Sequence, residues 1–104
     1  SGAYWHWYFL SQPAPFPERL IEGAPEAFLR AFLPAEGLAP AAFGEYLRAL
    51  RRPGTAHAMC EDYRAGASIH EAHDAETRDR RIACPTLVLW GERSLVGTTT
   101  DPLA

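Results

Sequence analysis

The chain has 104 residues, 47% of them hydrophobic and 22% charged, with a formal net charge of −3 at pH 7. This length suits one small domain, and the balance of apolar and charged residues argues against an intrinsically disordered chain. The net charge offers no basic field for nucleic acid. No stretch has the length and apolarity of a membrane span, and the start does not fit a secretory signal, so neither nucleic-acid nor membrane partners are expected.

Proline and glycine divide the first two thirds of the chain into short helices. Three prolines within residues 11–17 predict an extended loop, because each removes a backbone donor and fixes φ. Pro17, Pro25 and Pro40 can each stand in the first turn of a helix, where the missing N–H would have no partner in any case. We therefore predict four helices, over about residues 17–21, 25–33, 40–52 and 55–64, which end at Gly23, Pro34, Pro53 and Gly66.

The last third of the chain changes character. Ser68 and Glu71 have the spacing of a capping box, in which the hydroxyl and the carboxylate bond the free N–H groups at a helix start. They predict a polar, solvent-facing helix that continues through Arg81. The short apolar run from Thr86 to Gly91 is typical of a strand buried on both faces of a parallel sheet.

One strand cannot satisfy its backbone alone, so the sequence predicts a fragment of a larger α/β protein. The chain also lacks an initiator Met and starts within an aromatic pattern. We predict two parts: a helical segment over residues 1–66, and a returning helix and buried strand of an incomplete α/β core over 67–104. Cys60 and Cys84 are too few for a disulfide framework, which favours reduced thiols in a cytoplasmic protein.

The chain opens on an unusual run of aromatic side chains, residues 4–9, of which residues 4–8 all carry hydrogen-bond donors, and a further phenol follows at Tyr63. One interpretation is ordinary core packing, which explains most aromatic clusters. The other is a cage in which the imidazole of His6, the indole of Trp7 and the phenol of Tyr63 point at one dry pocket. Three such donors would stabilise a compact anion as it develops.

Five blocks of the chain resemble the haloacetate (fluoroacetate) dehalogenases of the α/β-hydrolase superfamily. They are residues 4–7 (YWHW), 9–15 (FLSQPAP), 59–67 (MCEDYRAGA), 84–92 (CPTLVLWGE) and 101–104 (DPLA). The first and third blocks are specific, whereas the fourth is shared by many α/β-hydrolases. Together the blocks reach from one end of the chain to the other, with residues 1–66 matching the helical cap of that family.

The resemblance implies a hydrolase that removes halide from a small haloacid by attack of an Asp, followed by hydrolysis of the ester by His-activated water. In that family a His-Trp pair and a Tyr bind the leaving halide, and the matching positions here are His6, Trp7 and Tyr63. The resemblance implies no cofactor and no metal, and it points to a homodimer of the full-length enzyme. The nucleophile and the catalytic His are expected outside residues 1–104, so we expect the chain alone to be inactive.

Two alternatives stay open from the sequence. The chain could be the cap of another α/β-hydrolase, such as an epoxide hydrolase or an esterase, or a helical binding module without catalysis. His57 with Cys60, and His70 with His73, have a spacing that can place two metal ligands on one helix face. Neither pair matches a closed zinc signature, so we predict no metal site.

Overall fold

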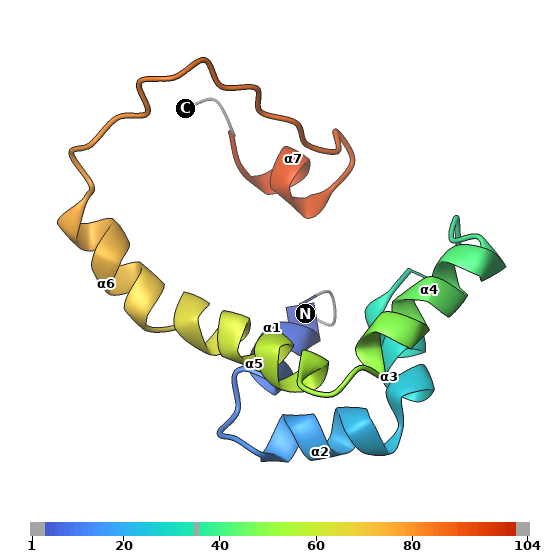
Figure 1. Ribbon diagram of the computed structural model, residues 1–104. Helices are drawn as coiled ribbons and strands as arrows, with labels where there is room; N and C mark the ends of the chain where they lie inside the picture. The colour runs from blue at the N-terminus through green and yellow to red at the C-terminus, as the bar shows by residue number, and fades with distance from the viewer. Residues whose placement is uncertain (1–3, 35, 102–104) are drawn as a thin grey trace.

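The computed structural model describes residues 4–34 and 36–101, and within these ranges it is entirely helical or irregular. Figure 1 shows helices α1 to α5 gathered together, with α6 leading away from them and α7 lying apart at the end of a long irregular segment. The described helices are α1 (Trp5–Leu10), α2 (Phe16–Gly23), α3 (Pro25–Phe32), α4 (Pro40–Leu50), α5 (Thr55–Gly66), α6 (Ile69–Glu76) and α7 (Leu95–Thr99).

The predicted helices of the first two thirds are confirmed, and proline determines where three of them begin. Helices α2, α3 and α4 each carry a proline in their first two positions, which are Pro17, Pro25 and Pro40. The fixed φ of proline suits the first turn of a helix, and its missing N–H needs no partner there. Helix α1 brings the opening aromatic run into helical spacing.

Helix α5 is the centre of the helical group, because α1, α2 and α4 all pack against it. The buried apolar side chains come from α1 to α5 and form one cluster: Leu10, Ile21, Phe28, Leu29, Leu47, Leu50, Ala56 and Cys60. Burial of this apolar surface holds short helices that would be marginal alone in water. Helix α1 packs on α5 (Figure 1), and this packing brings His6 of the opening aromatic run beside Tyr63 in the second half of α5.

The predicted strand is not present among the described residues. Residues 82–91 form no strand, and Leu87 and Leu89 are 81% and 82% exposed rather than buried. The physical reason is the one that the sequence already indicates: a strand needs backbone partners, and no described segment runs beside this one. Figure 1 shows this stretch as an arc outside the helices.

Two further expectations for the last third need correction. Helix α6 ends at Glu76 instead of Arg81, and the Ser68 side chain makes no capping bond to it. Its hydroxyl instead donates to the carbonyl oxygen of Arg64 at 2.6 Å, because the end of α5 offers an unpaired carbonyl one turn away. The short helix α7 was not predicted, and the Ser94 side chain caps it by accepting from the N–H of Gly97.

None of the helices in the described part of the chain has the length and apolarity of a membrane-spanning helix. Helix α6 has no buried residue, as expected for the solvent-facing helix that the polar sequence predicts.

Gly54 sits immediately before α5 at φ +84°, in the left-handed region. A Cβ is strained there, so we expect Gly54→Ala to lower the free energy of unfolding by about 1 kcal/mol. Gly44 is the matched control, because a Cβ at this position inside α4 would meet nothing within 4 Å. Gly44→Ala should raise stability by roughly 0.5–1 kcal/mol through helix propensity. Urea unfolding measures both, and shifts of the same sign would contradict the left-handed assignment.

Candidate functional site

The rings of His6 and Tyr63 are brought into contact although the residues are far apart in the sequence. Their centroids lie 5.8 Å apart with the planes at 87°, an edge-to-face arrangement. The imidazole also contacts the ring of Phe32 of α3, with centroids 5.1 Å apart and the planes at 81°. Edge-to-face pairs are a favoured aromatic geometry. His6 is half-buried, and contacts with these two rings restrict the orientation of its imidazole.

Trp7 and Tyr63 line the same hollow, of about 490 Å³, together with Asp62, Gly66, Ala67 and His70. The indole of Trp7 is 57% exposed, whereas Tyr63 is half-buried. His6 is not among the residues that line this hollow. The structure therefore unites Trp7 with Tyr63 in one hollow and His6 with Tyr63 in one ring contact. A single cavity shared by all three is not formed by the described residues.

The donors of these three side chains have no partner within the described part of the chain: no hydrogen bond from the His6 ring, the Trp7 indole or the Tyr63 hydroxyl is made there. Burial, with a smaller contribution from the charge of Asp62, raises the pKa of Tyr63 above its usual value. The phenol therefore keeps its proton at neutral pH and remains a donor.

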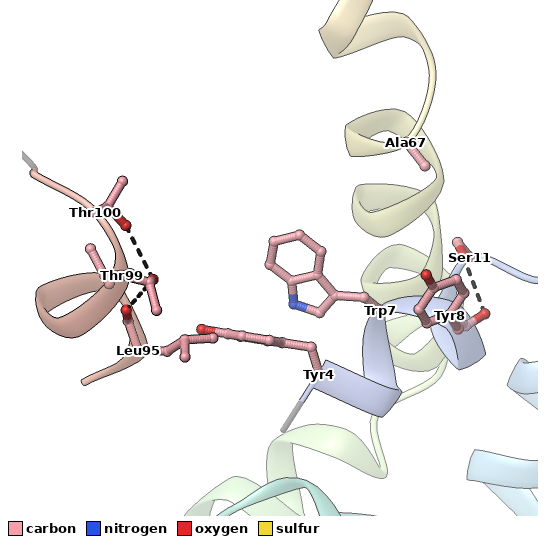
Figure 2. A pocket seen from close by; sticks show the side chains of 9 residues that line it. Tyr4, Trp7, Tyr8, Ser11, Ala67, Leu95, Thr99 and Thr100 are labelled. Carbon is pink, nitrogen blue, oxygen red and sulfur yellow. Dashed lines mark hydrogen bonds between the residues drawn. The ribbon is translucent and has the colours of Figure 1, made fainter. Parts of the chain in front are cut away.

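A second hollow of about 520 Å³ lies between α1 and α7 and is also lined by Trp7 (Figure 2). Tyr4 and Trp7 lie beside each other there, with ring centroids 5.2 Å apart. Its lining is largely apolar and does not include His6 or Tyr63: Tyr4, Trp7, Tyr8, Ser11, Ala67, Leu95, Val96, Thr99 and Thr100. This hollow is larger, but the first one holds two of the predicted donors, so the first is the better candidate.

One feature of the site was missed by the sequence analysis: a buried ion pair directly beside Tyr63. Glu18 of α2 is only 5% exposed, and Arg64 binds both of its oxygens, with Nη1 at 2.7 Å from Oε1 and Nη2 at 3.1 Å from Oε2. The hydrogen bonds from Arg64 are the main reason that the pKa of Glu18 falls from 4.5 to about 2, against the opposing effect of burial. The pKa of Arg64 rises for the same reason.

The same arginine joins three segments. Its Nε and Nη2 donate to the backbone carbonyl oxygen of Gln12 at 2.9 and 2.7 Å, and its Nη1 also contacts Glu61 at 2.7 Å. A signal for this network exists in the sequence, because Glu18 shares the buried face of α2 with Pro17 and Ile21. A carboxylate on an apolar face needs a charged partner.

Carboxylates and a histidine meet at one point of the structure, where oxygens of Glu18 and Glu61 and a ring nitrogen of His57 lie within 4.8 Å of one another. The Arg64 guanidinium already binds both carboxylates, so a cation placed there would face a positive charge. The arrangement favours an ion-pair network over a metal site. His70 and His73, like Cys60, are not part of this group.

No protein-family model matches the chain. A fluoroacetate dehalogenase from Burkholderia sp is 41% identical over 102 residues, which cover 92% of this chain and 34% of that protein. A solved structure from Salmonella enterica, described as a candidate acyltransferase, has a TM-score of 0.83 and 44% identity over 94% of this chain and 34% of its own.

A second solved structure, from Pseudomonas aeruginosa, is described as a candidate epoxide hydrolase. Its TM-score is 0.79 and its identity 43%, over 98% of this chain and 36% of that one. A mutant of the same protein, solved with bound MFA, matches equally well. The chain spans about a third of each relative. These matches confirm the predicted resemblance: over nearly all of its length the chain is similar to about a third of a haloacetate dehalogenase of the α/β-hydrolase superfamily.

Proposed function

We propose that this chain is part of a hydrolase that cleaves the carbon–halogen bond of a haloacetate, fluoroacetate above all, and releases glycolate and halide. Residues 1–66 act as the helical cap, and residues 67–104 lead back into an α/β core. In this role His6, Trp7 and Tyr63 bind the halide as it leaves. The substrate is a small haloacid, and the reaction needs no cofactor or metal.

The observation that carries this proposal is the placement of Tyr63. Its ring contacts His6 and it shares a hollow with Trp7, and all three donors are free within the described residues. The 41% identity to a fluoroacetate dehalogenase extends over 92% of this chain. A partly buried donor without a hydrogen-bond partner costs free energy, and an anion that accepts from it would remove this cost.

Fluoride gives the three donors a chemical purpose. It is a small, strongly hydrated ion and a poor leaving group, so the loss of its water must be offset by short hydrogen bonds. Donors that meet the ion only as the carbon–fluorine bond breaks act in the transition state and therefore raise kcat. The resemblance assigns the attacking Asp and the water-activating His to parts of the enzyme beyond residues 1–104. We therefore expect no halide release from the isolated chain.

We further propose that residues 86–91 form a buried strand once a parallel sheet lies beside them. The sequence there is a continuous apolar run, and its exposed Leu87, Leu89 and half-exposed Trp90 are costly in water. In this arrangement the strand belongs to the hydrolase core and carries no part of the halide site.

The proposal is tested with the complete open reading frame that contains this sequence. We expect the expressed protein to release fluoride from fluoroacetate, and His6→Ala to reduce the rate about 100-fold, since loss of one donor at a developing anion typically has this effect. His73→Ala on exposed α6 is the matched control and should leave the rate unchanged. Equal rates for wild type and His6→Ala would remove His6 from the halide site.

The same preparation decides between hydrolase classes. A wild-type protein that hydrolyses an epoxide or an ester and releases no fluoride would overturn the dehalogenase proposal and favour the alternative suggested by the structure from Pseudomonas aeruginosa.

A further inference from the structure

Arg64 follows Tyr63 on α5, and its guanidinium donates the hydrogen bonds that link α5 to Gln12, in the segment after α1. That side chain is 17% exposed, so its bonds form in a partly dry environment. A planar guanidinium can serve several acceptors at once in a fixed geometry, which an ammonium group cannot do. Here the acceptors are Glu18, Glu61 and the carbonyl oxygen of Gln12.

Gln12 in turn is fastened to α1. Its backbone N–H donates to the carbonyl oxygen of Phe9 at 3.2 Å, and its side-chain Nε2 donates to that of Tyr8 at 2.9 Å. The helix that ends there carries His6 and Trp7. A continuous path of hydrogen bonds therefore runs from Arg64 through Gln12 to the helix that presents two of the proposed halide donors.

The other branch of the network holds α2. Glu18 accepts two bonds from Arg64, and His57 Nδ1 lies 3.3 Å from its Oε1. Because α1 and α2 both pack on α5, the guanidinium fixes both against the helix that carries Tyr63. No donor of the halide site takes part in these bonds, so the network can position the site without occupying it.

We propose that Arg64 is a positioning residue of the halide site, which sets the distance between the donors on α1 and the hydroxyl of Tyr63 through its bonds to Gln12 and Glu18. This inference rests on the proposed function. Small displacements of a positioned group weaken the transition state more than substrate binding. Fluoride depends on the donors more than chloride does, since it is the poorer leaving group.

The test measures kcat and KM for fluoroacetate and chloroacetate with wild type and Arg64→Lys. This substitution keeps the positive charge but removes the planar guanidinium that serves several acceptors. We expect kcat for fluoroacetate to fall about 10–100-fold, with a smaller fall for chloroacetate and little change in KM. Arg48→Lys is the control, because Arg48 forms an exposed pair with Glu45 on α4. If Arg64 had a merely structural role, kcat would fall equally for both substrates, and that result would overturn the inference.

Gln12→Ala decides the matter if Arg64→Lys does not fold. It removes the bond to Tyr8 at an exposed position, and the same shift of the fluoroacetate-to-chloroacetate ratio is expected, with a smaller loss. An unchanged ratio overturns the inference while leaving the proposed function intact, provided that Tyr63→Phe still slows fluoride release. A wild-type protein that releases no fluoride overturns the proposed function, and this inference with it.

Discussion

Removal of two donors at once, in Trp7→Phe combined with Tyr63→Phe, will slow fluoride release from fluoroacetate by about 1000-fold or more. Each substitution keeps an aromatic ring and deletes one N–H or O–H donor. Trp7→Phe also removes part of the indole, but Trp7 is 57% exposed, so little packing is lost. One such donor at a developing anion is worth about 100–1000-fold in kcat. Steady-state fluoride release by the protein from the complete reading frame, with each single variant beside the double one, gives the measurement.

The loss should fall on kcat and not on KM, because the donors meet full negative charge only when the bond breaks. The single effects will not simply multiply, since both groups line one hollow and, in the proposed function, bind the same ion. Tyr46→Phe deletes a hydroxyl from an exposed side chain of α4 and is the control for the Tyr63 change. A double variant within tenfold of wild type would show that these donors do not stabilise the departing ion.

Local sequence signals were sufficient for helices α2 to α5, whereas α1 (Trp5–Leu10) was not predicted. Pro17, Pro25 and Pro40 stand where α2, α3 and α4 begin, because the restriction that proline imposes acts on its own turn. The predicted ends at Gly23 and Gly66 also agree with α2 and α5. In these helices the decisive interactions lie within a few residues, which is the range that a sequence pattern describes.

The structure of the last third of the chain depends on contacts with other segments, and a local sequence pattern does not describe such contacts. The apolar run at residues 86–91 has strand propensity, but a strand forms only when another strand pairs with it, and none lies beside it among the described residues. The predicted capping box does not form, because the Ser68 hydroxyl donates its hydrogen bond to the carbonyl oxygen of Arg64 instead. A capping motif predicts a helix start poorly where the serine hydroxyl has another hydrogen-bond acceptor nearby.

For the candidate site, the sequence indicated the three donor side chains but not the ion pair that lies beside them. His6 and Trp7 stand next to each other, so their pairing is visible in the sequence, whereas the contact with Tyr63 depends on the packing of α1 against α5. The pair between Glu18 and Arg64 joins residues 46 positions apart and needs the folded helices to bring them together. An unpaired carboxylate on an apolar helix face was its only local sign.

The same pair leads to the largest expected effect on stability. The Glu18 carboxyl is buried and bound by Arg64, with His57 also near it, and its pKa of about 2 lies below the usual 4.5. A pKa that is lower in the folded state means that the folded protein favours the charged carboxylate. We therefore expect Glu18→Gln to lower the free energy of unfolding by about 3 kcal/mol at pH 7, as measured by urea unfolding.

This difference should depend on pH with a definite sign. It is fully present above pH 4.5, where Glu18 is ionised in both states, and it is lost as the pH falls through the folded-state pKa near 2. Glu45→Gln is the control, since that exposed pair with Arg48 contributes less than about 1 kcal/mol. If Glu18→Gln and wild type differed by the same amount at pH 6 and pH 2.5, the ion pair would not be the cause.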